Sequence, residues 1–184
     1  MSSLLVLVGL VALVVLWAVA IYNGLVRKRN MVEEAWSGID VQLKRRTDLI
    51  PNIVSTVKGY AAHEKGTLED VVRLRGQAQS AQGVAETAQA QGMLGAALGK
   101  LFALAENYPD LKANTNFIQL QASLGEIEEQ LQLARRYYNG AVRDLNIAVE
   151  SFPSNLVASR FGFAKAEFFE LESAAERTVP KVEF

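Results

Sequence analysis

The residues that enzymes use for chemistry are few in this chain, and none has the partners that a catalytic site needs. The 184 residues include one histidine, His63, and no cysteine. Glu64 follows His63, but a zinc-binding helix of the His-Glu-x-x-His type needs a second histidine at position 67, which is a threonine. A di-iron bundle needs the Glu-x-x-His pair twice. We predict that His63 is a polar residue at the surface or in a satisfied helix position.

Two other patterns match catalytic motifs only in part. The segment from Gly95 to Leu101 is one residue shorter than a phosphate-binding loop between its glycines, and it has leucine where serine or threonine should bind magnesium. Its two glycines more readily allow two helices to approach closely. Glu126, Glu128 and Glu129 fall on the exposed side of a helical stripe, without a histidine or serine partner. The sequence therefore predicts no enzyme activity, no cofactor and no metal site.

Charge is distributed unevenly along the chain. The sequence has 19 Lys and Arg and 20 Asp and Glu, for a net charge of −1, and none of these residues precedes Arg27. With an isoelectric point near 5.9, a broad electropositive surface is not expected, and so we predict no nucleic-acid partner. The lack of cysteine excludes disulfides, cysteine-based zinc sites and an N-terminal lipid-attached cysteine.

The N-terminal segment is apolar enough to cross a membrane. From Leu4 to Tyr22 every residue except Gly9 is hydrophobic or aromatic. A helix of about 20 such residues, at about 1.5 Å per residue, crosses a hydrocarbon core of about 30 Å. Residues 1–26 are therefore predicted to form a transmembrane anchor, with the membrane lipids as a first partner.

Basic residues at the end of this segment indicate its orientation. Arg27, Lys28 and Arg29 follow it directly, residues 44–46 add a second basic triplet, and the positive-inside rule then places the rest of the chain in the cytoplasm. The first triplet can serve as a clamp on anionic lipid. A cleaved signal peptide is an alternative, because residues 18–20 resemble a cleavage site, but the basic region that should precede the apolar run is absent. A reversed orientation is a further alternative.

The remaining residues show helical periodicity. Apolar residues recur in steps of three and four, which is typical of coiled coils and helical bundles. Arg46 fills a polar slot in the first stripe. Pro51 removes a donor from that helix and crowds the carbonyl of Thr47, so we expect a kink there, with the helix continuing to about Arg75. The second strong stripe should be capped by Asn114 or Thr115.

The predicted fold class is all-α. We expect an N-terminal transmembrane helix followed by an elongated, mostly antiparallel bundle of about four helices in residues 27–178, with a C-terminal tail in residues 179–184. A soft connection rich in Ala, Gln and Gly begins at position 76. The helices of the bundle are expected at about 27–75, 86–107, 114–152 and 164–177.

Motifs along nearly the whole chain resemble those of the LemA family. The resemblance rests on Glu34-Ala35-Trp36-Ser37, the run from Asp40 to Arg46, Asp48-Leu49-Ile50-Pro51-Asn52, Lys58, Tyr60, Ala61, His63, Glu64, the run Tyr108-Pro109-Asp110-Leu111-Lys112-Ala113-Asn114, Asn116-Phe117, Arg135-Arg136, Tyr138-Asn139, Asn146, Phe152-Pro153-Ser154-Asn155, and Tyr22-Asn23 at the end of the anchor.

The resemblance implies a bacterial membrane protein with one N-terminal span, a short outer N-terminus, an antiparallel helical bundle and no known enzyme activity. Some members carry a lipid-attached cysteine in place of the anchor, and self-assembly and membrane shaping are suggested for the family. We therefore expect a scaffold in the bacterial inner membrane that forms homo-oligomers and contacts other membrane proteins. The alternative is an accessory or regulatory subunit of a membrane enzyme, such as a protease.

Overall fold

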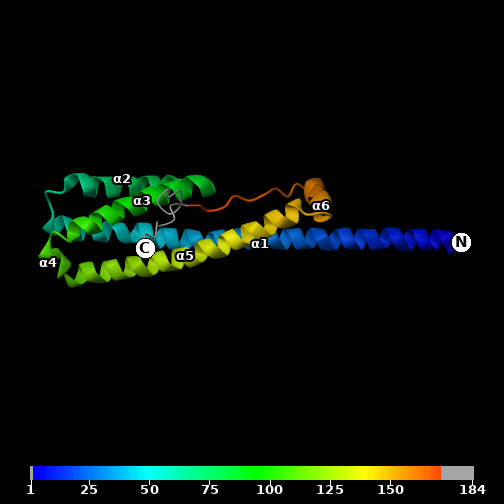
Figure 1. Ribbon diagram of the computed structural model, residues 1–184, viewed down its shortest axis with the longest axis horizontal. Helices are drawn as coiled ribbons and strands as arrows, with labels where there is room; N and C mark the ends of the chain where they lie inside the picture. The colour runs from blue at the N-terminus through cyan, green and yellow to red at the C-terminus, as the bar shows by residue number, and fades with distance from the viewer. Residues whose placement is uncertain (1, 171–184) are drawn as a thin grey trace, which may run out of the picture. The chain divides into compact units, whose positions relative to one another are not determined.

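The computed structural model describes residues 2–170, and every regular element among them is a helix (Figure 1). This confirms the predicted all-α fold class. The predicted tail at 179–184, and the part of the last predicted helix beyond residue 170, lie outside the described residues. The helices are α1 (Ser2–Tyr60), α2 (Lys65–Ser80), α3 (Gly83–Ala105), α4 (Pro109–Lys112), α5 (Thr115–Glu150) and α6 (Ser154–Phe161).

The chain divides into two compact units, which are described separately. Within the described residues, unit 1 comprises residues 2–39 and 134–167, and unit 2 comprises residues 40–133 and 168–170. Two long helices, α1 and α5, contribute residues to both units. Unit 1 therefore holds the apolar N-terminal stretch, and unit 2 holds α2, α3 and α4.

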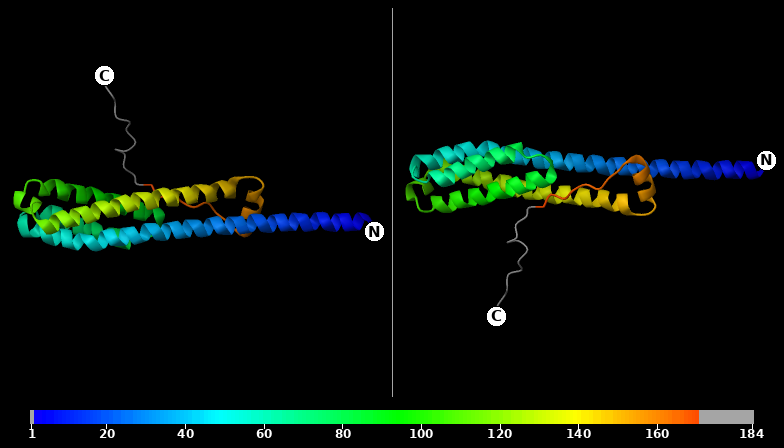
Figure 2. Two further views of the ribbon diagram at one scale, coloured as in Figure 1. Left: turned by 90° about the horizontal axis from the view of Figure 1, so that it is seen from below. Right: turned by 90° about the horizontal axis from the view of Figure 1, so that it is seen from above.

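Unit 2 is a helical bundle around an aliphatic core. Figures 1 and 2 show α2 and α3 running beside one another and beside the C-terminal part of α1. Apolar residues spaced three and four apart on each helix turn toward this centre, as expected for amphipathic helices. Its most deeply buried members are Ile50, Ile53, Val57, Val71, Leu94, Leu101 and Leu111.

The prediction that the first helix continues to Arg75 is wrong. α1 ends at Tyr60, and α2 begins at Lys65 after a turn of four residues. This turn brings Val71 of α2 into the same core as Val57 of α1. In one continuous helix those two residues would lie about 21 Å apart, because each residue adds about 1.5 Å. Folding back therefore buries two apolar stripes that a straight helix would leave exposed.

The helix continues through Pro51, as expected, and a side chain from α2 replaces the hydrogen bond that this proline cannot make. Proline has no N–H, so the carbonyl of Thr47 loses its partner within the helix. Arg75 Nε donates to that carbonyl at 2.8 Å. Thr47 is itself buried, where an unpaired carbonyl would be costly. Arg75 thus stabilises a helix that contains an internal proline.

In unit 1, α6 folds back beside the N-terminal part of α1 (Figures 1 and 2). Leu25 of α1 is buried together with Val157 and Ala158 of α6 and with Phe163, which follows α6. Gly162 takes a left-handed backbone conformation, with φ of 72°, and ends the helix there. The core of unit 1 is therefore built partly on the apolar N-terminal helix.

The predicted helix from residue 164 is wrong as far as the structure describes it, because residues 163–170 are not helical. The side chain of Asn146 binds both backbone groups of Ala166, donating to its oxygen at 3.0 Å and accepting from its nitrogen at 2.8 Å. Tyr138 donates its hydroxyl to the carbonyl of Glu167 at 2.8 Å. These side chains on α5 supply the hydrogen bonds that a helix would have made internally.

Candidate functional site

The most deeply buried charged group of unit 2 is Arg46, which lies on α1 and faces α3 and α5. Its side chain is 6% exposed, and its Nε atom lies 2.8 Å from Oε1 of Glu128, although the N–H is not aligned with that oxygen as in a hydrogen bond. Nη1 donates to the side-chain oxygen of Gln91 at 3.2 Å and to its backbone oxygen at 3.4 Å. One guanidinium therefore joins three helices through polar contacts.

Burial lowers the pKa of Arg46, and the Glu128 carboxylate partly offsets this effect. Arginine has so high an intrinsic pKa that it stays protonated at neutral pH despite such a shift. Gly95 leaves space for the guanidinium, because a Cβ at that position would lie 3.0 Å from Nη2 of Arg46. We expected Gly95 to let two helices approach closely, but in the structure it makes room for the buried Arg46 side chain.

The prediction that Glu128 belongs to a solvated face is only half correct. Its side chain is 44% exposed, yet its carboxylate is the ion-pair partner of Arg46. Arg46 fills the polar slot in the first apolar stripe, and the structure identifies the carboxylate that pairs with it there. Buried charges in proteins need such partners. Arg46, Glu128 and Gln91, here called the Arg46 centre, therefore stabilise one arrangement of the three helices.

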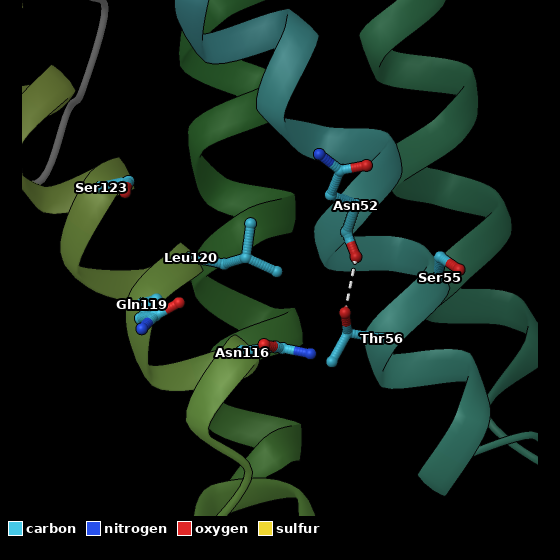
Figure 3. A pocket seen from close by; sticks show the side chains of 7 residues that line it. All are labelled: Asn52, Ser55, Thr56, Asn116, Gln119, Leu120 and Ser123. Atoms are coloured by element: carbon cyan, nitrogen blue, oxygen red, sulfur yellow. Dashed lines mark hydrogen bonds between the residues drawn. The ribbon is translucent and has the colours of Figure 1, made fainter.

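A polar groove between α1 and α5 of unit 2 is the candidate binding site (Figure 3). Its volume is about 450 Å³. In Figure 3 the amide of Asn116 extends from α5 toward Thr56 on α1, and the hydroxyl of Thr56 donates to the backbone oxygen of Asn52 at 2.8 Å. The groove is lined by Asn52, Ser55, Thr56, Asn116, Gln119, Leu120 and Ser123.

The chemistry of this groove is hydrogen bonding. Among the described residues that line it, none carries an ionisable group. Amides and hydroxyls both donate and accept hydrogen bonds, but they do not supply a general acid or base at neutral pH. The groove is therefore suited to binding an uncharged polar surface. Of its residues, Asn52 and Asn116 are motif positions, and the others were not identified from the sequence.

Several motif residues meet at the end of unit 2 where the turns lie. The Asn114 side chain caps α5 by accepting from the N–H of Phe117 at 3.0 Å, and its amide donates to the hydroxyl of Tyr60 at 2.8 Å. Tyr108 donates its hydroxyl to Glu64 at 3.1 Å, and this hydrogen bond raises the pKa of Tyr108. Two tyrosines thus connect the α1–α2 turn to the turns around α4.

His63 lies in this same turn and is exposed. Pro109 is the first residue of α4, a position where the missing N–H costs nothing. Within residues 2–170, no cluster of three or more His, Asp or Glu could hold a metal ion. The hydrogen bonds at this end of unit 2 therefore hold the turns together, and the exposed imidazole of His63 lies in one of those turns.

In unit 1 the motif residues Trp36 and Tyr138 pack together. Their ring centroids are 5.4 Å apart, in a tilted arrangement. Burial raises the pKa of Tyr138, and the nearby Glu167 carboxylate raises it further. Because Tyr138 also donates to the backbone of residue 167, one side chain fixes both a ring contact and the extended segment.

One residue of the predicted lipid clamp, Arg29, also contacts the protein, and its side chain is exposed. Arg29 places its guanidinium carbon 5.4 Å from the centroid of the Phe163 ring, a cation–π contact, and its Nε atom lies 3.9 Å from Glu33. Arg27 is exposed, and Lys28 is half-buried. Arg29 therefore also contributes to the packing of unit 1.

The other motif residues are spread over both units. In unit 2, Asp48 forms an exposed ion pair with Lys44 at 2.8 Å. In unit 1, Arg136 is exposed on α5, the neighbouring Asn139 is half-buried, and Pro153 directly precedes α6. These positions are not gathered with Arg46 or with the groove, so the motif residues do not form one site.

Sequence reasoning missed the partners of Arg46. Gln91 is 3% exposed, although a glutamine in the expected helix at 86–107 would ordinarily lie on the exposed side. The usable signal was that Gln91 continues an apolar series at helical spacing with Leu94 and Leu98. An arginine in one apolar stripe and an amide in another are the expected signature of a polar contact inside a bundle.

The apolar part of α1 is exposed in the structure. Its 18-residue window has a mean hydropathy of 3.1, and none of that window is buried. By length and composition this helix can cross a membrane. The described residues thus define an all-helical protein with one helix of this kind near its N-terminus.

Comparisons with known proteins agree with this class. A model of the LemA family matches residues 35–184, and the chain therefore belongs to the LemA family. It is similar to magnetosome protein MamQ 2 of Paramagnetospirillum magneticum, with 27% identity over 184 aligned positions, 86% of this chain and 68% of the relative. Protein LemA of Metamycoplasma hominis is 25% identical over 150 positions, 80% of this chain and 68% of the relative. The chain is thus a LemA-type membrane protein.

Proposed function

We propose that this protein is a non-enzymatic scaffold of the bacterial inner membrane that crosses the bilayer once and associates with copies of itself. Its N-terminus would lie outside, and the helical bundle from residue 27 onward would lie in the cytoplasm. The observation that carries the proposal is the exposed apolar window of α1, near the N-terminus of a chain that has no charged residue before Arg27. An apolar helix surface of this length is stable only in lipid or against protein.

The orientation can be tested with single cysteines, because the native chain has none. Ser3→Cys and Ser80→Cys place a thiol on either side of the predicted span. In cells with a permeabilised outer membrane, we expect an impermeant maleimide to label Ser3→Cys, and to label Ser80→Cys only after lysis. The reverse pattern would show the opposite orientation, and loss of the N-terminal peptide from the mature mass would show a cleaved signal.

Self-association is supported by the polar groove of unit 2. Its amides and hydroxyls carry both donors and acceptors, so two copies of the same surface can satisfy one another without opposite charges. A homodimer contact of this type would join Gln119 and Ser123 of one copy to the groove of the next.

The test is to place charge in the groove. Gln119→Arg with Ser123→Arg puts two like charges at the proposed contact, whereas Gln77→Arg with Ser80→Arg adds the same charge on exposed α2. We expect the first pair to reduce the cross-linked dimer in native membranes at least fivefold, and the control pair to leave it unchanged. Equal cross-linking of both variants, or a monomer at every concentration in detergent, would disprove self-association through this groove.

A second candidate function is that of an accessory subunit of a membrane enzyme. A groove of about 500 Å³ between α1 and α2 has an apolar floor that includes Val54, Leu68 and Val72. Its rim carries Lys58 and Lys65, with a third cation and one carboxylate beside them. Apolar contacts flanked by positive charge fit an acidic amphipathic helix.

This second function predicts a defined partner at that groove. A photo-crosslinking amino acid in place of Val72 should capture one membrane enzyme in native membranes. Lys58→Glu with Lys65→Glu should abolish the adduct, whereas Lys100→Glu on α3, outside the groove, should not. If no adduct forms, or if the adduct survives charge reversal, the groove is not a binding site for an acidic helix.

A further inference from the structure

One part of unit 1 packs against the apolar stretch of α1 rather than against its charged continuation. The turn after α5 and helix α6, residues 151–162, are here called the elbow. Val157 and Ala158 of the elbow share a core with Leu25, and Ala18 and Ile21 are partly buried against the same core. Figures 1 and 2 show α6 beside this part of α1 from each direction.

The depth of this contact is given by the sequence of α1. Ala18 lies four residues before Tyr22, the last residue of the apolar run, which is about 6 Å along a helix, and Leu25 lies three residues after Tyr22. The elbow therefore covers the end of the apolar run and the residues directly after it. A protein segment beside the end of a spanning helix lies in the interfacial layer of the bilayer, where the headgroups meet the hydrocarbon core.

The outer surface of the elbow is apolar where water would favour polar groups. Phe152 is 80% exposed, Leu156 is 60% exposed and Phe161 is 61% exposed. Leu156 and the exposed Arg160 are four residues apart on α6, which places them on one side of that helix, and Phe152 lies in the turn before it. An apolar surface with an arginine beside it is typical of segments at membrane interfaces, where the long side chain reaches the headgroups.

Ring contacts connect this surface to the anchor. The Tyr22 ring of α1 lies 4.9 Å from the Phe161 ring and 5.7 Å from the Phe163 ring, in edge-on geometry. Trp17, one helical turn or so earlier, is 49% exposed. Tyrosine and tryptophan favour the interfacial layer of a bilayer. The exposed surface of the elbow is therefore continuous with the lipid-facing surface of α1.

We propose that the elbow is a second membrane-contacting element, which inserts Phe152, Leu156 and Phe161 into the interfacial layer of the leaflet where α1 emerges. Its ligand is the lipid bilayer itself. The proposal rests on the proposed function in one respect, because it assumes that α1 crosses the membrane. It adds that the protein contacts lipid through a segment more than 120 residues away in the sequence, so that unit 1 is held against the bilayer at two points.

The test uses the full chain in vesicles of phosphatidylcholine and phosphatidylglycerol. Single cysteines at Phe152 and Leu156 carry an environment-sensitive fluorophore, and lipids with a nitroxide on the acyl chain serve as quenchers. The matched control is Tyr137→Cys, an aromatic position on α5 of the same unit that is 53% exposed. We expect blue-shifted emission and at least threefold stronger lipid quenching at positions 152 and 156 than at position 137. Quenching equal to the control would overturn the proposal.

A label at Leu10 separates this proposal from the assumption beneath it. If the Leu10→Cys label is not quenched, α1 does not enter the bilayer, and the proposed function itself fails. If Leu10 is quenched and positions 152 and 156 are not, only the elbow proposal fails. A blue shift at 152 and 156 without lipid quenching, which disappears on dilution with excess lipid, would show that a second copy covers the elbow, and this result would also overturn the lipid proposal.

Discussion

The two units use different kinds of contact to hold their helices. Unit 2 has an aliphatic core at helical spacing, with the charge of Arg46 enclosed among three helices. Unit 1 depends more on rings and on side chains that bind backbone, as in the Trp36–Tyr138 pair and the Asn146–Ala166 hydrogen bonds. The same two helices, α1 and α5, therefore contribute to two packing solutions along their lengths.

The difference shows where specificity comes from in a chain of long amphipathic helices. Aliphatic stripes bury surface, but they tolerate sliding by a turn, because one leucine resembles the next. A buried ion pair in unit 2 and directional hydrogen bonds in unit 1 each allow one register only. Removing each of these contacts in turn should therefore destabilise mainly the unit that contains it.

The largest effect is expected from Arg46→Ala. The substitution leaves a cavity and removes the hydrogen bonds to Gln91, so we expect the free energy of unfolding to fall by about 2–4 kcal/mol. Arg46→Met, which fills most of the volume without the charge, should cost less than half as much. Urea unfolding of the full chain in detergent, followed by circular dichroism, measures both variants. A loss below about 0.5 kcal/mol for Arg46→Ala would mean that the centre does not stabilise unit 2.

The next effect is expected in unit 1, from Asn146→Ala. Both backbone groups of Ala166 lose their partner, at a cost of about 2 kcal/mol for two hydrogen bonds. Hydrogen exchange should rise in a peptide covering residues 163–170, while exchange in α2 and α3 should stay unchanged. Asp144→Ala, at an exposed position two residues earlier, is the control. Faster exchange in α2 as well would show that the two units unfold together.

The sequence was most informative where apolar spacing alone determines structure. The stripe from Phe117 to Leu145 predicted α5, and the resemblance to the LemA family agrees with the family model. The helix predictions from sequence failed at Tyr60, where α1 ends, and after Phe163, where the chain is not helical. In each place contacts between distant residues outweigh the local helical preference. Val71 finds its partner only when the chain folds back, and residues 163–170 stay extended because Asn146 and Tyr138 bind their backbone.

The candidate groove was harder to predict than the fold. Asn52 and Asn116 belong to motifs, but Gln119 and Ser123 are ordinary residues for the exposed side of a helix. Only the approach of α1 and α5 places Asn52 of α1 opposite the other three, which lie on α5. A single sequence gives the helical faces, but it does not give the pairs of faces that meet.

A smaller effect should come from the contact that supports Pro51. Arg75→Met leaves the carbonyl of Thr47 without a donor, and we expect a loss of about 1–2 kcal/mol. Pro51→Ala restores an N–H that can donate to that carbonyl, so the same Arg75→Met change should then cost less than about 0.5 kcal/mol. A double-mutant cycle of urea unfolding measures this coupling. Equal costs in both backgrounds would show that Arg75 acts through another contact.

The smallest effect compares two glycines of α3 with different surroundings. Alanine at Gly99, where a Cβ has nothing within 4 Å, should stabilise the helix by about 0.5–1 kcal/mol because alanine is the better helix former. Alanine at Gly95 should give little or none of this gain, because its Cβ would lie 3.0 Å from Nη2 of Arg46. In the Arg46→Met background, thermal unfolding should show the full gain at Gly95 as well. If Gly95→Ala stabilises the native chain as much as Gly99→Ala, the guanidinium has room to move, and the centre is less rigid than its contacts indicate.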